Sequence, residues 1–214
     1  MSIARLAGRL RALHAESGGV YSTADLGVLV ERLHPARLAE AIRLLVREGV
    51  LLRLRRGLYL DRLHGYRPEV AGERWVAPAY LSTESALDRH ALCQTGILAS
   101  TYVTTRLLAS RARAVRSLEG RRFVYRHVAA HLFFGYQPED GLLVAEPEKA
   151  VLDFLYFVYK KQRSVLSPQD IDFRRLNASR YRAYVKAYRQ AGFAAYALAW
   201  LRKGRARDKR GDRR

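Results

Sequence analysis

The sequence has few residues that could cross-link the chain, bind a metal through sulfur or anchor it in a membrane. It contains one cysteine, Cys93, among 214 residues, so no disulfide can form within the chain and no cysteine-based metal site is possible. No apolar run reaches the roughly 20 residues of a membrane-spanning helix. A lone thiol suits a reducing compartment, so we expect a cytoplasmic protein that does not contact a membrane.

Short motifs of several enzyme classes are also missing. The sequence has no phosphate-cradling glycine loop and no Gly-x-Ser-x-Gly turn. His127 and His131 are four residues apart, but they span an expected strand and its end, so they do not share one helix face as a metal-binding pair would. We therefore expect no catalytic residue, no metal and no cofactor.

Acidic residues are scarce relative to basic ones. The chain has 39 Lys and Arg against 20 Asp and Glu, a formal net charge of +19, and six of the basic residues are lysine. Such a charge predicts salt-dependent attraction to polyanions, and guanidinium groups suit phosphate and guanine. A GC-rich genome also enriches arginine, and composition alone does not separate these two origins.

Residues 35–60 are the most informative stretch. Pro35 suits the first position of a helix over 35–48, whose apolar residues recur at helical spacing, and Gly49 suits its end. Val50, Leu52 and Leu54 then alternate with Leu51, Arg53 and Arg55, the period of a half-buried strand. Arg56-Gly57 forms a turn, and a second strand follows at 58–60. The pattern predicts an amphipathic helix followed by a basic hairpin.

Two further helices are expected before this unit. Ile3, Leu6, Leu10 and Leu13 have helical spacing, and Ser22 or Thr23 can cap the second helix, with Asp25 completing a box-like start. Three helices and a two-stranded wing over residues 1–62 predict a winged helix-turn-helix. In such a fold the third helix enters the major groove of DNA and the second crosses the backbone.

This prediction assigns DNA contacts to eight residues. Arg37, Arg43 and Arg47 would face the major groove, with Arg43 or Arg47 reading guanine. Arg53, Arg55 and Arg56 would hold phosphates or probe the minor groove, while Ser22 and Thr23 would donate to phosphate. The simpler alternative is that the helix arginines only solvate an exposed face. The basic hairpin favours DNA binding over that alternative.

The rest of the chain predicts an α+β organisation. Residues 63–78 are expected to be a linker, 79–201 a mixed α/β domain with C-terminal helices, and 202–214 a basic, disordered tail. A helix starts at Pro147, with Glu146 and Glu148 at its positive end. We expect Asp153 to pair with an arginine of the sheet and Glu84 to lie on a solvated helix face. Tyr181, Tyr184 and Tyr188, at helical spacing, are expected in a core or interface.

Several blocks of this second region carry a resemblance. They are YLSTESAL at Tyr80–Leu87, YVTTR at Tyr102–Arg106, RRFVYRHV at Arg121–Val128, LFFGY at Leu132–Tyr136 and AEPEKAVLD at Ala145–Asp153. Together with RLRRGLYL at Arg53–Leu60, they resemble the AbiEi-like antitoxin and transcriptional-regulator family of type IV toxin–antitoxin systems. The resemblance covers about residues 1–160. The sequence RHALCQTG, residues 89–96, departs from the glycine-containing segment that relatives often have there.

The resemblance implies a repressor that binds inverted repeats in its own promoter, with assembly into an oligomer on the DNA left open. It also implies that the second domain neutralises a nucleotidyltransferase-like toxin without a need for direct contact. Three alternatives remain: a DNA-binding regulator without a toxin, a nucleic-acid-processing enzyme that uses acids of the second domain, and a module whose winged helix binds protein.

Overall fold

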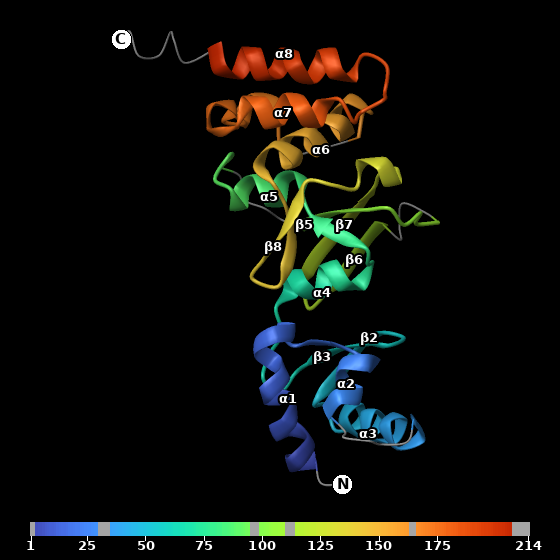
Figure 1. Cartoon of the computed structure of the whole chain (residues 1–214). Coiled ribbons are helices and arrows are strands. Elements are labelled where there is room, and N and C mark those ends of the chain that lie inside the picture. The colour runs from blue at the N-terminus through green and yellow to red at the C-terminus, as the bar shows by residue number, and fades with distance from the viewer. Residues whose placement is uncertain (1–2, 30–34, 95–98, 110–113, 163–165, 207–214) are drawn as a thin grey trace. The chain divides into compact units, whose positions relative to one another are not determined.

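The computed structural model of the chain describes residues 3–29, 35–94, 99–109, 114–162 and 166–206. The chain divides into two compact units, Met1–Ala77 (unit 1) and Pro78–Arg214 (unit 2). Unit 1 combines helices with a three-stranded antiparallel sheet, and unit 2 combines helices with a six-stranded mixed sheet (Figure 1). The fold is mixed α+β, which confirms the class that the sequence predicts.

Unit 1 is built from helices around the sheet β1-β3-β2. Its elements are α1 (Ile3–Ser17), β1 (Val20–Ser22), α2 (Thr23–Leu29), α3 (Pro35–Arg47), β2 (Leu51–Arg55), β3 (Leu58–Asp61) and α4 (Pro68–Trp75). The expected third helix and hairpin strands are present with nearly the predicted bounds. Strand β1 was not predicted. It pairs with β3 across about 40 residues of sequence, for example Tyr21 with Tyr59, and such distant pairing leaves no local pattern.

The core of unit 1 follows from the apolar spacing of α1 and α3. Leu6 and Leu10, one helical turn apart, are buried, and Ile42 and Leu45 of α3 pack into the same cluster with Leu51 of β2. Burying each such side chain contributes about 1.5–3 kcal/mol. The apolar face of α3 is thereby fixed toward the core, so its opposite face is held toward solvent.

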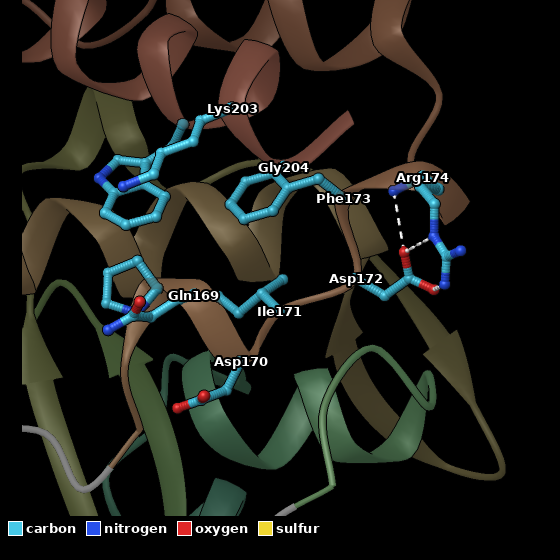
Figure 2. A pocket seen from close by; sticks show the side chains of 10 residues that line it. Gln169, Asp170, Ile171, Asp172, Phe173, Arg174, Lys203 and Gly204 are labelled. Atoms are coloured by element: carbon cyan, nitrogen blue, oxygen red, sulfur yellow. Dashed lines mark hydrogen bonds and ion pairs between the residues drawn. The ribbon is translucent and has the colours of Figure 1, made fainter. Parts of the chain in front are cut away.

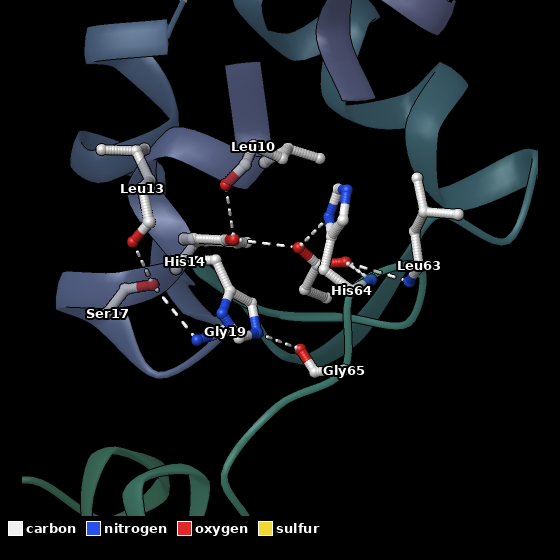
Figure 3. Close-up of polar contacts among 10 residues, drawn as sticks. Leu10, Leu13, His14, Ser17, Gly19, Leu63, His64 and Gly65 are labelled. Carbon is white, nitrogen blue, oxygen red and sulfur yellow. Dashed lines mark hydrogen bonds and ion pairs between the residues drawn. The ribbon is translucent and has the colours of Figure 1, made fainter. Parts of the chain in front are cut away.

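A polar network that includes Leu10 and His14 of α1 connects this helix to the end of β3 and to the residues after it (Figure 3). The buried Asp61 carboxylate accepts hydrogen bonds from the Tyr21 hydroxyl and from the backbone N–H groups of Leu63 and His64, each at 2.9 Å. His64 Nδ1 lies 3.0 Å from the same carboxylate. Burial, and next the neighbouring Asp61, raise the pKa of Tyr21 above its ordinary value. A buried carboxylate needs such donors, and here they fix where β3 ends.

The segment predicted to be a linker, residues 63–78, contains helix α4. Pro68 lies in its first turn, and Val70 and Ala71 are buried, so the helix belongs to the core of unit 1. Arg74 also donates to the carbonyl of Val20 at 2.6 Å. The prediction relied on glycine and proline as chain breakers, but proline at the start of a helix is favourable.

Unit 2 contains the sheet β6-β7-β5-β4-β9-β8, in which β4 pairs parallel with β9 and β5 parallel with β7. The strands are β4 (Ala79–Leu81), β5 (Ala99–Thr104), β6 (Val115–Leu118), β7 (Arg121–His127), β8 (Tyr136–Glu139) and β9 (Leu142–Ala145). The helices are α5 (Thr83–Arg89), α6 (Pro147–Tyr159), α7 (Ala178–Val185) and α8 (Phe193–Ala206), and short 3₁₀ turns occupy Ala130–Leu132, Pro168–Asp170 and Phe173–Arg175.

Helix α6 is the centre of unit 2, because every residue from Glu148 to Phe157 is buried. The sequence predicted a single apolar stripe, which underestimates how completely the helix is enclosed by sheet, α5, α7 and α8. Tyr181 and Tyr188 are buried against it, as the sequence predicts, while Tyr184 is half-buried. Helix α8 extends to Ala206, so the first residues of the predicted disordered tail are helical, and the remainder lies outside the described residues.

Asp153 does not pair with an arginine of the sheet, contrary to the prediction. Its carboxylate forms an ion pair with Lys149 one helical turn before it, and it accepts hydrogen bonds from Tyr80 at 2.8 Å and Tyr188 at 2.9 Å. Ser82 Oγ also donates to it at 2.9 Å rather than capping α5. The lysine and the aspartate are both fully buried, and burial lowers the pKa of Lys149 while Asp153 opposes that shift.

Candidate nucleic-acid interface

The three arginines predicted to face DNA from α3 are all on its exposed side. Arg37, Arg43 and Arg47 are exposed, whereas Ala41, Ile42 and Leu45 of the same helix are buried. Arg43 Nε donates back to the carbonyl of Ala39 at 3.3 Å, and Arg47 Nε contacts the exposed Glu48 carboxylate at 3.0 Å. Exposed contacts of this kind contribute little to stability. The guanidinium groups can therefore exchange them for a charged ligand at small cost.

The β2–β3 hairpin presents the second basic group. The Arg53 and Arg56 side chains are exposed, and within the part of the chain that the structure describes neither side chain forms a hydrogen bond or an ion pair. Gly57 adopts φ 76° and supplies the positive backbone angle of the turn. A bulge between Arg53 and Arg55 shifts the register of β2 against β3, while burial still alternates from Leu52 to Arg55 as the sequence predicts.

Arg55 is held differently from its neighbours. One of its amino groups donates to the carbonyl of Arg74 at the end of α4 at 3.2 Å, and the other donates to the carbonyl of Arg56 at 3.3 Å. Both bonds are to neutral acceptors, so the positive charge stays uncompensated. Arg55 thereby links the hairpin to α4, a structural role that the sequence did not indicate.

Ser22 and Thr23 have separate roles at the start of α2. Ser22 Oγ accepts from the backbone N–H of Asp25 at 3.1 Å, and Asp25 Oδ2 accepts from the backbone N–H of Ser22 at 2.7 Å. This is the reciprocal box that the sequence predicts, and it already occupies an acceptor site of the Ser22 hydroxyl. The backbone N–H of Thr23 donates to the carbonyl of Gly57 at 3.2 Å, and the Thr23 side chain is exposed.

The contact between Thr23 and Gly57 fixes the tip of the hairpin against the start of α2. In Figure 1, α3 and the hairpin tip extend to the side of unit 1 that faces away from α1. The predicted site residues are therefore carried by the end of β1, by α2, by α3 and by the hairpin of one packed unit. Sequence spacing did not reveal this cross-contact, because it joins residues 34 positions apart.

Two of the three acids that a nuclease could use beside Lys149 are enclosed, whereas Glu146 is half-buried and accepts from the Tyr184 hydroxyl. Glu148, Lys149 and Asp153 are each at most 2% exposed, so a substrate cannot reach them in this structure. Glu84, expected on a solvated face, is buried and contacts Arg126 at 3.4 Å, because α5 packs its polar start against the sheet. Among the described residues, no group of three or more His, Cys, Asp and Glu side chains could hold a metal ion.

No family model matches the chain, and no curated protein matches its sequence. Among the described residues, no helix is long and apolar enough to cross a bilayer. The resemblance to the AbiEi-like family therefore stays a prediction carried by the sequence blocks.

Proposed function

We propose that unit 1 is a winged helix-turn-helix that binds double-stranded DNA. The observation that carries this proposal is that six exposed arginines, on α3 and on the adjacent hairpin, project from one packed unit whose apolar faces are buried beneath them. The order of helices and strands supports it, because a helix that presents arginines to solvent is followed directly by a two-stranded wing.

The six arginines and the two hydroxyl residues have different tasks in this proposal. Arg43 and Arg47, which make only weak contacts on an exposed helix face, read guanine in the major groove, and Arg37 assists from the first turn. Arg53 and Arg56 bind phosphates from the hairpin. Arg55 holds the hairpin against α4 and adds its charge to the phosphate contacts. Thr23 can donate to a phosphate, while Ser22 mainly caps α2.

The biological role we propose is that of a cytoplasmic repressor that binds its own promoter and acts as the antitoxin of a nucleotidyltransferase-like toxin. The exposed arginines support the DNA-binding part. The antitoxin part depends on the resemblance of the sequence blocks, and a nucleotidyltransferase-like reading frame beside the gene would support it.

The test is duplex binding by the full chain. Fluorescence anisotropy with the DNA upstream of its own gene, and with a shuffled duplex of equal length, gives the specific and the non-specific affinity. We expect tighter binding to the upstream DNA, and we expect the variant Arg43→Ala/Arg47→Ala to lose that preference. Arg11→Ala, which removes an exposed arginine of α1, is the matched control and should keep it. Equal affinity of the wild type for both duplexes would contradict the proposal.

A further inference from the structure

A cavity of about 270 Å³ lies in unit 2 between the 3₁₀ turns at Pro168–Asp170 and Phe173–Arg175 and the last turns of α8 (Figure 2). Trp200, Phe173, Ile171 and Pro168 give it apolar walls, and Lys203 and Gln169 add polar groups. This volume is slightly below the roughly 300–1,000 Å³ of sites for drug-sized ligands. It suits one small ring system rather than a larger molecule.

The aromatic walls favour a flat ligand. The rings of Trp200 and Phe173 lie within 15° of parallel, with centroids 6.4 Å apart, and because Phe173 is buried, Trp200 offers the accessible ring surface. The Lys203 ammonium lies over one face of the Trp200 ring, 4.9 Å from the ring centre, so a positive charge is placed at that face of the indole. Trp200 is half-buried, which leaves part of the indole open to a ligand.

Of the two carboxylates that line the cavity, Asp172 is compensated by an ion pair, whereas Asp170 is bonded to a neutral backbone group and keeps its charge. Asp172 forms a two-point ion pair with Arg174, at 2.8 and 3.0 Å, which lowers the pKa of Asp172. Asp170 accepts from the backbone N–H of Ser167 at 3.0 Å. Figure 2 shows both carboxylates directed away from the Phe173 ring and Ile171.

The surface of this part of the chain is strongly basic. Residues 166–206 contain nine Lys and Arg against two Asp, and all nine basic side chains are exposed. They come from the 3₁₀ turn Phe173–Arg175, from α7 and the turn after it, and from the end of α8, the element that also carries Trp200. Lys203 and Arg174 line the aromatic cavity, and the other basic side chains belong to the same C-terminal segment. Aromatic surfaces together with basic side chains are the combination with which proteins bind unpaired nucleic-acid strands.

We infer that the C-terminal helical part of unit 2 binds single-stranded nucleic acid, with one base in the Trp200 cavity and neighbouring phosphates on the exposed Lys and Arg side chains. A base in a duplex would have to be unpaired and unstacked before it could enter, so the site discriminates against double strands. The inference does not depend on the proposed function, because its residues belong to unit 2 and the proposed duplex site belongs to unit 1.

The test measures binding of a labelled, non-self-complementary 12-nucleotide strand to the full chain by fluorescence anisotropy, with DNA and RNA versions as separate arms. We expect the wild type to bind at least one version. Trp200→Ala should weaken that binding about tenfold or more, as loss of one stacked base does, and Trp200→Phe should keep most of it. Lys203→Ala should weaken it more than Lys186→Ala, which removes an exposed lysine after α7.

A second readout does not require loss of the Trp200 side chain. The chain has two tryptophans, so Trp75→Phe leaves Trp200 as the single reporter, and saturating strand should quench its emission by stacking. Arg43→Ala/Arg47→Ala should leave single-strand affinity unchanged. The inference is overturned if no strand binds, if Trp200→Ala binds like the wild type, if the Trp200 emission does not change, or if the unit 1 variant loses single-strand binding.

Discussion

In unit 1, the arginines of α3 and of the β2–β3 hairpin lie at the surface, whereas in unit 2 Lys149 and Asp153 are enclosed on all sides. The net charge of each unit does not explain this difference in where the charged side chains lie. Unit 1 has 13 Lys and Arg against 8 Asp and Glu, and unit 2 has 26 against 12. The unit proposed to bind duplex DNA is therefore the less charged of the two. What distinguishes it is the placement of its charges on one helix face and one hairpin.

The physical consequences of the two arrangements differ in size. Removing one partner of a buried ion pair leaves an uncompensated charge in a low-dielectric interior, which costs several kcal/mol of stability. Removing an exposed arginine usually changes stability by less than about 0.5 kcal/mol. Variants of unit 2's buried pair should thus affect folding, and variants of unit 1's arginines should affect binding.

The largest effect is expected for Asp153→Asn. It leaves Lys149 charged without a counter-ion, so unit 2 should lose about 3–5 kcal/mol of unfolding free energy, measured by urea denaturation. Adding Lys149→Met removes the unpaired charge and should recover at least half of that loss. If Asp153→Asn alone lowers the unfolding free energy by less than about 1 kcal/mol, the pair is not the buried centre of unit 2.

Arg47→Ala should have the next largest effect, on binding. If Arg47 reads a guanine, its loss costs about 1–3 kcal/mol of affinity for the preferred duplex and relaxes the preference at one base position. Binding to single-base variants of the promoter duplex measures this. Equal losses on promoter and shuffled DNA would contradict base reading by Arg47 and assign it a phosphate instead.

Arg56→Ala should weaken binding to every duplex to a similar degree. A lost phosphate contact lowers the slope of log affinity against log salt concentration by about 0.9. Titrations at several salt concentrations, with Arg11→Ala as the control from α1, measure this slope. An unchanged slope for Arg56→Ala would remove the hairpin tip from the interface.

Local sequence patterns predicted some elements of the fold and missed others. Helical spacing predicted α3 to within one residue of its end, and alternation predicted the hairpin. The capping box of Ser22 and Asp25 could also be predicted, because the two residues are three positions apart. Each of these is a local pattern. The same reasoning missed β1 and α4, because β1 depends on a distant partner in β3 and α4 is a helix only in the context of the core it covers.

The charged residues of α6 illustrate the same limit. The spacing of Lys149 and Asp153 places them on one helix face, so their pairing was available from the sequence. Their burial was not, because it depends on Tyr80 from β4 and Tyr188 from the segment after α7. For the candidate site, composition and spacing predicted which arginines are exposed. The hydrogen bond from Arg55 to α4 could not be predicted, because it depends on the folded position of α4.

The smallest effect concerns pH and the exposed pair of Asp172 with Arg174. Arg174 lowers the pKa of Asp172 below 3.8, so the ion pair stabilises the folded state above that pH and is lost as pH falls through the folded pKa. Arg174 is more than half exposed, so the contribution should stay below about 1 kcal/mol. Comparing Asp172→Asn with the wild type at pH 7 and pH 3 should show a difference that shrinks in acid. A difference that grows in acid would contradict this sign.

The most direct test of the central claim removes the same charge from each unit. One variant replaces Arg37, Arg43, Arg47 and Arg56 of unit 1 by alanine, and the other replaces Arg182, Lys186, Arg189 and Arg202 of unit 2, all eight being exposed. Affinity for the promoter duplex and for a shuffled duplex is then measured at one salt concentration. The account predicts that the unit 1 variant loses promoter preference and most affinity, while the unit 2 variant keeps its preference. Equal losses in both variants would mean that net charge, not the display of arginines on unit 1, determines binding.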